Sequence, residues 1–159
     1  MKSFYEVSSG FTLIELLVVT GIMAVLTAVG VASYNQFNDK QKVDQAAREL
    51  VSNLKKAQSN AAVGRKDSCS QSLEGWYADL SARTYYGQCS GGTKFPNPPL
   101  SLITGNFSLT STPPASVIKF EPLTGETSSN LIITVSTDPA GTIKKKVAVT
   151  PKGVIELVP

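Results

Sequence analysis

The chain has 159 residues, 15 of them basic and 12 acidic, and a net charge of +3. Such a mild positive excess does not by itself indicate nucleic-acid binding. Histidine is absent and only two cysteines occur, so the commonest general base and metal ligand is missing. We therefore expect a protein that is not an enzyme and that holds no metal and no cofactor. The length leaves room for one small folded domain beside an apolar N-terminal segment.

The first predicted element is a helix over residues 11–33, an apolar stretch in which Glu15 is the single charge. At a rise of about 1.5 Å per residue this stretch is about 34 Å long, enough for a hydrocarbon core of about 30 Å. We expect it to span a membrane once. The hydroxyl groups of Thr20 and Thr27 should bond to carbonyls of the preceding turn, which lowers their cost in lipid.

Glu15 is the candidate functional residue of this segment. A carboxylate inside a spanning helix costs on the order of 3 kcal/mol and usually has a partner. Cleavage after Gly10 would create a free amine on Phe11, one helical turn from Glu15, and the same amine on a neighbouring subunit is a second candidate. Such a contact would set the axial stagger between subunits. Two plainer interpretations are an ordinary single-pass anchor with a chance glutamate and a secretory signal peptide cleaved near Ala32.

The run Gly10-Phe11-Thr12-Leu13-Ile14-Glu15-Leu16-Leu17 resembles the type IV prepilin signature. The resemblance implies that a prepilin peptidase/N-methyltransferase cuts between Gly10 and Phe11 and methylates the new amine of Phe11. It assigns to Glu15 a role in assembly with other pilin-like subunits into a helical filament, on an inner-membrane assembly platform. Residues 1–10 would be the leader peptide and residues 11–33 the transmembrane helix in membrane lipid. The head would lie outside the cytoplasm, in the periplasm or at the cell surface.

Two departures from that family's pattern bear on the type of subunit. Lys2 is the only basic side chain of the leader and is offset by Glu6, so the charge asymmetry that orients a membrane helix is weak. Ala32 stands where major pilins often have a helix-bending proline. This favours a minor pilin or a pseudopilin over a major fibre subunit.

The next predicted element is an amphipathic helix over residues 34–63, which continues the first helix into the head. Gly64 is its expected C-terminal stop. We expect its apolar stripe to pack on the protein's own β-sheet, although a coiled coil could use the same stripe. Apolar residues at spacings of three and four form this stripe: Val43, Ala47, Leu50, Leu54, Ala57 and Ala61.

Residues 64–159 are predicted to form a small antiparallel β head, because strand-like runs alternate with turn clusters and no second helix pattern appears. The chain is thus expected to be α+β with a pilin-like fold. Breaks are expected at 91–92, 96–99, 113–114, 139–141 and 151–153. The expected strands are 76–80, 84–88, 106–110, 117–121, 131–136, 143–150 and 154–158.

Cys69 and Cys89 are the only cysteines. If the head lies outside the cytoplasm, these two residues are expected to form a disulfide. A closed loop of that size would stabilise a small head by about 3 kcal/mol in the chain-entropy model. Two free buried thiols are the alternative.

The C-terminal pattern around Phe120, Gly125 and Gly153 resembles the GspH/FimT group of minor pseudopilins and minor pilins, in which a phenylalanine strand with a turn glycine precedes a final hairpin with its own glycine. Some members of that group bind DNA through basic C-terminal residues. Phosphate contact is therefore a candidate role for the cations near this hairpin, although lysines that block edge-to-edge strand pairing are the more ordinary explanation. These cations are Lys144, Lys145, Lys146 and Lys152.

The expected function is that of a structural subunit, a minor pseudopilin or minor pilin of a type II secretion or type IV pilus machine. The alternatives are a minor pilin that binds DNA during natural transformation and an unprocessed single-pass anchored binding protein.

Overall fold

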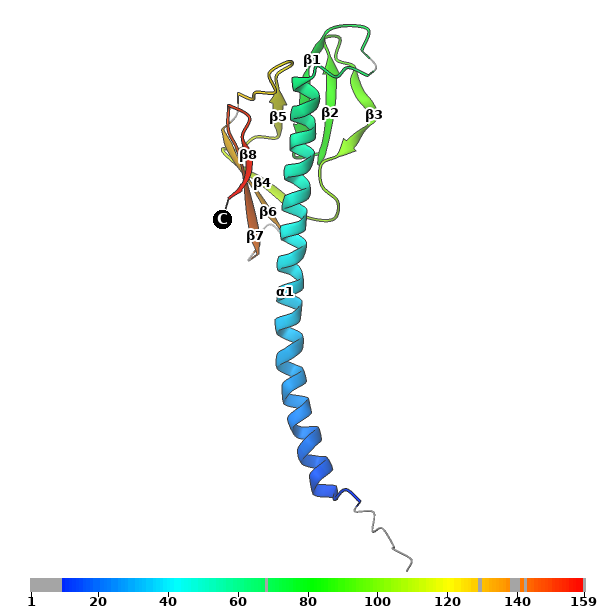
Figure 1. Cartoon of the computed structure of the whole chain (residues 1–159), viewed down its shortest axis with the longest axis vertical. Helices are drawn as coiled ribbons and strands as arrows, with labels where there is room; N and C mark the ends of the chain where they lie inside the picture. The colour runs from blue at the N-terminus through cyan, green and yellow to red at the C-terminus, as the bar shows by residue number, and fades with distance from the viewer. Residues whose placement is uncertain (1–9, 68, 129, 138–140, 142, 159) are drawn as a thin grey trace, which may run out of the picture. The chain divides into compact units, whose positions relative to one another are not determined.

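The computed structural model describes residues 10–67, 69–128, 130–137, 141 and 143–158, without the side chains of residues 28–33 and 97. Contacts divide the chain into an N-terminal unit that ends at Asn38 and a head unit that begins at Asp39. Helix α1 (Leu13–Ala62) contributes to both units (Figure 1).

Within the N-terminal unit, the threonine hydroxyls bond to the backbone of their own helix, as expected. Thr20 Oγ1 donates to the carbonyl oxygens of Leu16 and Leu17, both at 3.0 Å. Thr27 Oγ1 donates to the carbonyl oxygen of Met23 at 2.8 Å. Each hydroxyl therefore has a partner within its helix.

The C-terminal end of α1 has the geometry predicted for Gly64. Gly64 has a φ of 64°, its N–H donates to the Ala61 carbonyl at 2.9 Å, and the Arg65 N–H donates to the Asn60 carbonyl at 2.9 Å. These two bonds form a Schellman motif, which a glycine in the left-handed region completes without steric cost.

The strands of the head form two four-stranded antiparallel sheets, ordered β3-β2-β1-β5 and β4-β6-β7-β8, where one sheet was expected. In the head, β2 and β3 lie on one side of α1, and β7 and β8 lie on the other (Figure 1). The strands are β1 (Leu73–Asp79), β2 (Thr84–Cys89), β3 (Lys94–Ser101), β4 (Ser108–Thr112), β5 (Val117–Phe120), β6 (Leu131–Ser136), β7 (Lys144–Val149) and β8 (Ile155–Val158).

Strand β3 corrects the prediction of a break at residues 96–99. Pro96, Pro98 and Pro99 all lie within it, and proline cannot donate a ladder hydrogen bond. The strand tolerates them because it pairs only with β2 and is therefore an edge strand of its sheet. The expected strand over 106–110 is also shifted, since β4 begins at Ser108.

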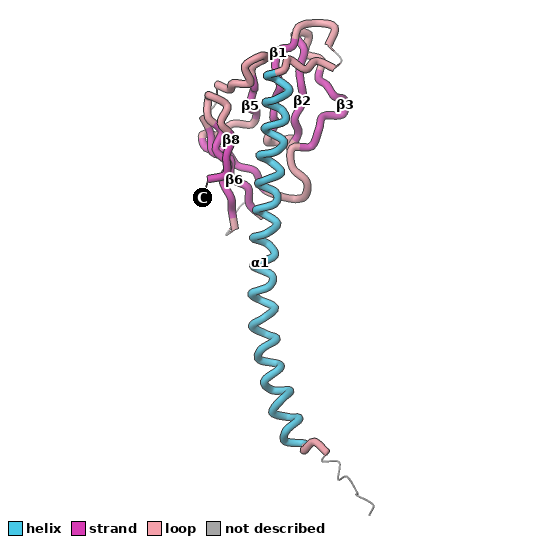
Figure 2. Tube along the Cα trace, viewed as in Figure 1, coloured by secondary structure: helices cyan, strands magenta, loops and turns pink. Residues whose placement is uncertain are grey.

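The core of the head lies between α1 and the two sheets, which Figure 2 shows around the helix. Every residue of the predicted apolar stripe of α1 is fully buried. The stripe therefore packs on the protein's own sheets, as predicted. A coiled coil would need the same side chains, which are already buried within the head. The buried partners from the sheets include Trp76, Phe95, Ile118, Phe120, Ile133, Val135, Val147 and Val149.

Cys69 and Cys89 form a disulfide that ties the segment after α1 to the end of β2. The Cα atoms of the two cysteines are 5.8 Å apart. Nearby, the indole Nε1 of Trp76 donates to the carbonyl of Arg65 at 3.0 Å. The disulfide and this hydrogen bond both anchor the connection from helix to sheet.

Candidate functional site: the N-terminal motif and the basic surfaces of the head

Thr12 caps the N-terminus of α1 and contacts the backbone of Glu15. Thr12 Oγ1 accepts a hydrogen bond from the Glu15 N–H at 3.3 Å, and the Leu16 N–H donates to the Thr12 carbonyl at 3.2 Å. A threonine followed three residues later by a glutamate is the sequence pattern of a capping box. An acidic side chain in the first turn is also favoured by the helix dipole. The observed capping bond uses the Glu15 backbone N–H. The sequence reasoning missed this cap, although the Thr12 to Glu15 spacing signals it.

The apolar side chains on both sides of this cap are exposed within the chain. The exposed fractions are 84% for Phe11 and 81% for Leu13, and the large apolar side chains as far as Leu26 remain about half exposed or more. A continuous exposed apolar surface normally contacts lipid or another protein. Where side chains are described, the structure contains no helix that combines the length and the hydropathy of a membrane span. Of the expected leader, only Gly10 is among the described residues, and it is exposed.

The turn glycines of the C-terminal pattern lie together beside the last turns of α1. Gln58 Nε2 donates to the carbonyl oxygens of Gly125 at 3.1 Å and of Gly153 at 2.7 Å. Both glycines have left-handed backbones, with φ of 67° and 77°. Phe120, the third residue of that pattern, is fully buried on β5. Gln58 was not singled out in the sequence, because nothing distinguishes its position from other polar positions of the helix.

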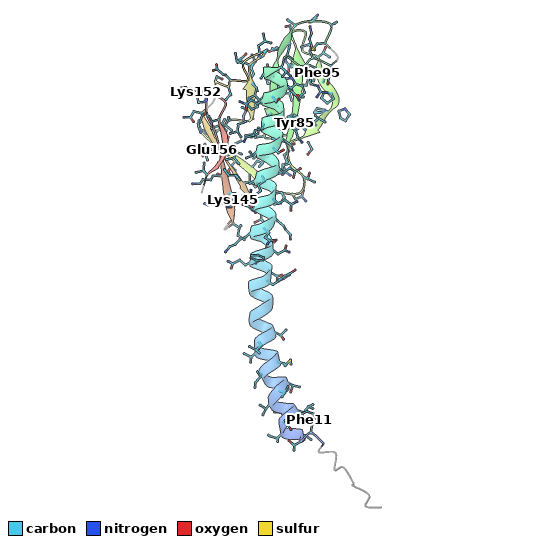
Figure 3. All side chains as sticks on the ribbon, in the orientation of Figure 1. Phe11, Tyr85, Phe95, Lys145, Lys152 and Glu156 are labelled. Atoms are coloured by element: carbon cyan, nitrogen blue, oxygen red, sulfur yellow. A yellow bond between two sulfur atoms is a disulfide. The ribbon has the colours of Figure 1, made fainter. Side chains whose placement is uncertain are left out.

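The four lysines considered as nucleic-acid contacts do not form one patch. Lys144, Lys145 and Lys146 begin β7, whereas Lys152 lies in the turn after that strand. Figure 3 places Glu156 between the labelled Lys145 and Lys152. Glu156 pairs with Ala148 across β7 and β8, so a negative charge interrupts the row of cations.

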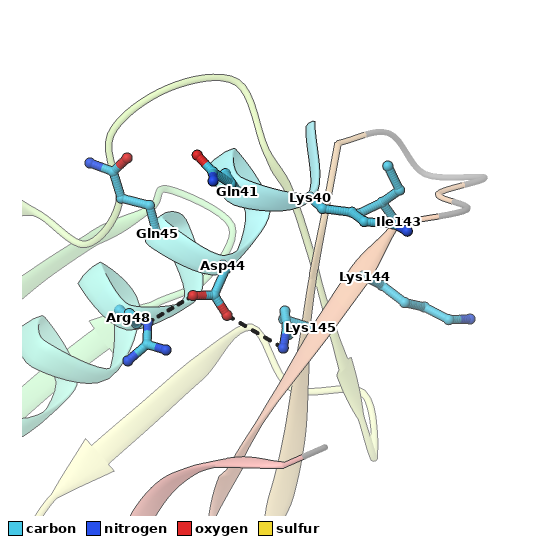
Figure 4. Close-up of a pocket in the computed structure, with 8 residues that line it drawn as sticks. All are labelled: Lys40, Gln41, Asp44, Gln45, Arg48, Ile143, Lys144 and Lys145. Carbon is cyan, nitrogen blue, oxygen red and sulfur yellow. Dashed lines mark hydrogen bonds and ion pairs between the residues drawn. The ribbon is translucent and has the colours of Figure 1, made fainter. Parts of the chain in front are cut away.

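Lys145 instead belongs to a groove between α1 and the start of β7, with a volume of about 740 Å³ (Figure 4). Asp44 lies in this groove and binds two cations: Arg48 Nε at 2.8 Å and Lys145 Nζ at 3.4 Å. The hydrogen bond from Arg48 is the main cause of the lowered pKa of Asp44, and Lys145 adds to it. The groove is lined by Lys40, Gln41, Asp44, Gln45, Arg48, Ile143, Lys144 and Lys145.

Comparison with known proteins identifies the N-terminal segment and the fold. Residues 7–31 match the family model described as the prokaryotic N-terminal methylation motif. The structure is similar to the crystal structure of the type IV minor pilin FimU from Pseudomonas aeruginosa strain PAO1, with a TM-score of 0.54 and 16% sequence identity, over 77% of this chain and 92% of that one. No curated protein sequence matches the chain. The chain thus combines a prokaryotic N-terminal methylation motif with a fold, one helix on antiparallel sheets, that is similar to the fold of a type IV minor pilin.

Proposed function

We propose that the chain is a minor pilin or minor pseudopilin, cut after Gly10, N-methylated at Phe11 and assembled into a filament through its N-terminal helix. The observation that carries this proposal is the match of residues 7–31 to the N-terminal methylation motif. The chain would be the substrate of a prepilin peptidase/N-methyltransferase and would serve as a structural subunit. Its placement in the GspH/FimT group is supported by Phe120, Gly125 and Gly153, the last two sharing Gln58 as a hydrogen-bond partner.

The proposal includes a membrane-inserted stage before assembly. Residues 11–33 would be held in membrane lipid, and neighbouring pilin-like subunits would replace that lipid in the filament, recruited on an inner-membrane assembly platform. The uncovered apolar side chains of this segment support the need for such partners. The disulfide between Cys69 and Cys89 supports a head outside the cytoplasm, because disulfides persist in oxidising compartments.

Glu15 would act in assembly by pairing with the Phe11 amine that cleavage creates. The test compares Glu15→Gln with Thr12→Ala in the native host. Glu15→Gln removes the negative charge, whereas Thr12→Ala removes the cap but leaves the carboxylate. We expect Glu15→Gln to be cleaved yet depleted at least tenfold from sheared filaments, and Thr12→Ala to be incorporated close to the wild-type level.

Two results of that comparison would count against the assembly role of Glu15. One is normal incorporation of Glu15→Gln. The other is an equal loss in both variants, which would assign the requirement to the integrity of the helix N-terminus and not to a pairing of the Glu15 charge. Whether the filament is a secretion pseudopilus or a pilus would follow from the subunits that crosslink to the chain within it.

A further inference from the structure

We propose that the groove between α1 and β7 binds an acidic polypeptide segment of a partner protein. Among the described residues, four cations, Lys40, Arg48, Lys144 and Lys145, line the groove with one carboxylate, Asp44. Asp44 is already held by Arg48 and Lys145. The groove therefore has positive charge beyond what its own carboxylate neutralises.

The wall of the groove that α1 forms offers donors to a ligand. Arg48 uses Nε for Asp44, and within the described part of the chain its two Nη groups have no hydrogen-bond partner. The ammonium group of Lys40 likewise has no partner among the described residues. The Arg48 side chain remains 69% exposed, so its free Nη donors can reach an incoming carboxylate.

The spacing of these donors favours a chain with several carboxylates over a single small anion. Lys40, Asp44 and Arg48 follow one another at intervals of four residues on α1. Lys40 and Arg48 are thus about 12 Å apart along the helix axis, at about 1.5 Å per residue. One phosphate or one carboxylate could contact both only if the two side chains bent toward each other over Asp44. An acidic peptide can place a carboxylate on each side of Asp44.

The same surface is a poor match for duplex DNA. The duplex carries one negative charge per about 1.7 Å and needs a continuous track of cations. Along β7 and β8 such a track is broken by Glu156, which lies opposite Ala148, before Lys152 is reached. None of the described residues that line the groove is aromatic, so the groove also lacks a platform on which the bases of a single strand could stack. Discrete carboxylates spaced around Asp44 fit this charge pattern better than a uniform row of phosphates.

The test measures binding of a fluorescent, end-capped hexaglutamate peptide to the full chain in a non-ionic detergent at low salt. We expect binding that weakens as salt rises. Lys40→Gln and Lys145→Gln should each weaken binding about fivefold, the size of a partly exposed ion contact. Asp44→Asn should strengthen binding about fivefold, because it frees Arg48 and Lys145 for the peptide.

Two matched controls remove one positive charge outside the groove. The controls are Lys55→Gln, on the same helix, and Lys152→Gln, in the β7–β8 turn. Neither substitution should change the affinity for the peptide more than twofold. The opposite effect of Asp44→Asn separates binding at the groove from misfolding, which would weaken binding in every variant. Competition by a duplex DNA oligonucleotide and by inorganic phosphate completes the test.

The proposal is supported if the peptide binds, the groove variants shift affinity in these directions and neither competitor displaces the peptide at equal charge concentration. It is overturned if the peptide does not bind, if Lys152→Gln weakens binding as much as Lys145→Gln, or if DNA binds more tightly with the same dependence on the groove. Displacement by inorganic phosphate would also overturn it, because that result assigns the groove to a single anion.

Discussion

Gln58 Nε2 donates to the carbonyl oxygen of Gly153 at 2.7 Å, and the same amide donates to that of Gly125 at 3.1 Å. One side chain of α1 thus fixes the loop after β5 and the turn between β7 and β8. The Thr127 N–H adds a direct bond between these two segments, to the Pro151 carbonyl at 3.1 Å. The end of α1 and both turns form one hydrogen-bonded unit.

Replacing Gln58 should therefore destabilise the head as a whole. Gln58→Ala leaves two partly buried carbonyls without their donor, which is expected to lower the free energy of unfolding by about 1–3 kcal/mol. Urea unfolding of the full chain in detergent, followed by the fluorescence of the single tryptophan, Trp76, measures this change. Gln45→Ala is the control, because Gln45 is exposed on the same helix. Equal midpoints for the two variants would contradict the bridging role.

Gly153 should tolerate no side chain. A Cβ there would collide with the Gln58 amide and lie 3.2 Å from the Gly125 carbonyl oxygen, on a backbone with φ of 77°. Gly153→Ala is expected to cost about 2–3 kcal/mol of unfolding free energy, by the same urea measurement. Gly92→Ala is matched to it, since Gly92 has φ of 80° but nothing within 4 Å of a Cβ. It should cost only about 1 kcal/mol. If Gly92→Ala lowers the free energy of unfolding as much as Gly153→Ala does, the collision with Gln58 does not contribute to the cost.

The sequence predicted the helix better than the sheets, for a physical reason. The helix stripe repeats at spacings of three and four over many residues, and all of it is buried. Strand β3 carries three prolines, and its pairing depends on the long-range choice of β2 as partner, which local patterns do not encode. The division into two sheets is likewise a matter of long-range pairing.

The candidate sites likewise were predictable from the sequence only where their residues are contiguous. The prepilin motif is contiguous and was readable from residues 10–17, whereas the groove joins Asp44 to Lys145 across most of the head sequence. The lysines near the last hairpin were grouped by proximity in sequence. Strand β7 contains Lys144, Lys145 and Lys146 but not Lys152, and the ammonium group of Lys145 binds Asp44.

Gly87 leaves space for the Phe95 ring, a contact that the sequence pattern did not indicate. It pairs with Phe95 across β2 and β3, and a Cβ at this position would lie 2.9 Å or less from three atoms of the Phe95 ring. That ring is buried against Trp76 in an edge-on contact, with centroids 5.4 Å apart. Gly87→Ala is therefore expected to cost about 1–3 kcal/mol through overpacking. In a Phe95→Leu background the same change should cost at least 1 kcal/mol less, and additivity of the two substitutions would contradict the contact.

Tyr77 should ionise only at high pH. Burial and the hydrogen bond of its hydroxyl to Glu74 Oε1, at 3.0 Å, raise the pKa of Tyr77 to about 12. The unfolded chain ionises this group near pH 10, so its contribution to stability is complete below pH 10 and is lost between about pH 10 and pH 12.

Absorbance titration of tyrosinate measures this directly. The wild-type chain should show one ionisation near pH 12 that is missing in Tyr77→Phe, and the variant's stability should fall less over this range. An unchanged high-pH ionisation in Tyr77→Phe would assign the raised pKa to another tyrosine.

The proposed function depends above all on processing of the chain at the Gly10–Phe11 bond. The most direct test is the intact mass of the chain purified from the membrane of its native host. We expect a mature chain that begins at Phe11 and carries one added methyl group on its N-terminal amine, with the Cys69–Cys89 disulfide intact. A mature chain that still begins at Met1, or that begins after Ala32, would contradict it.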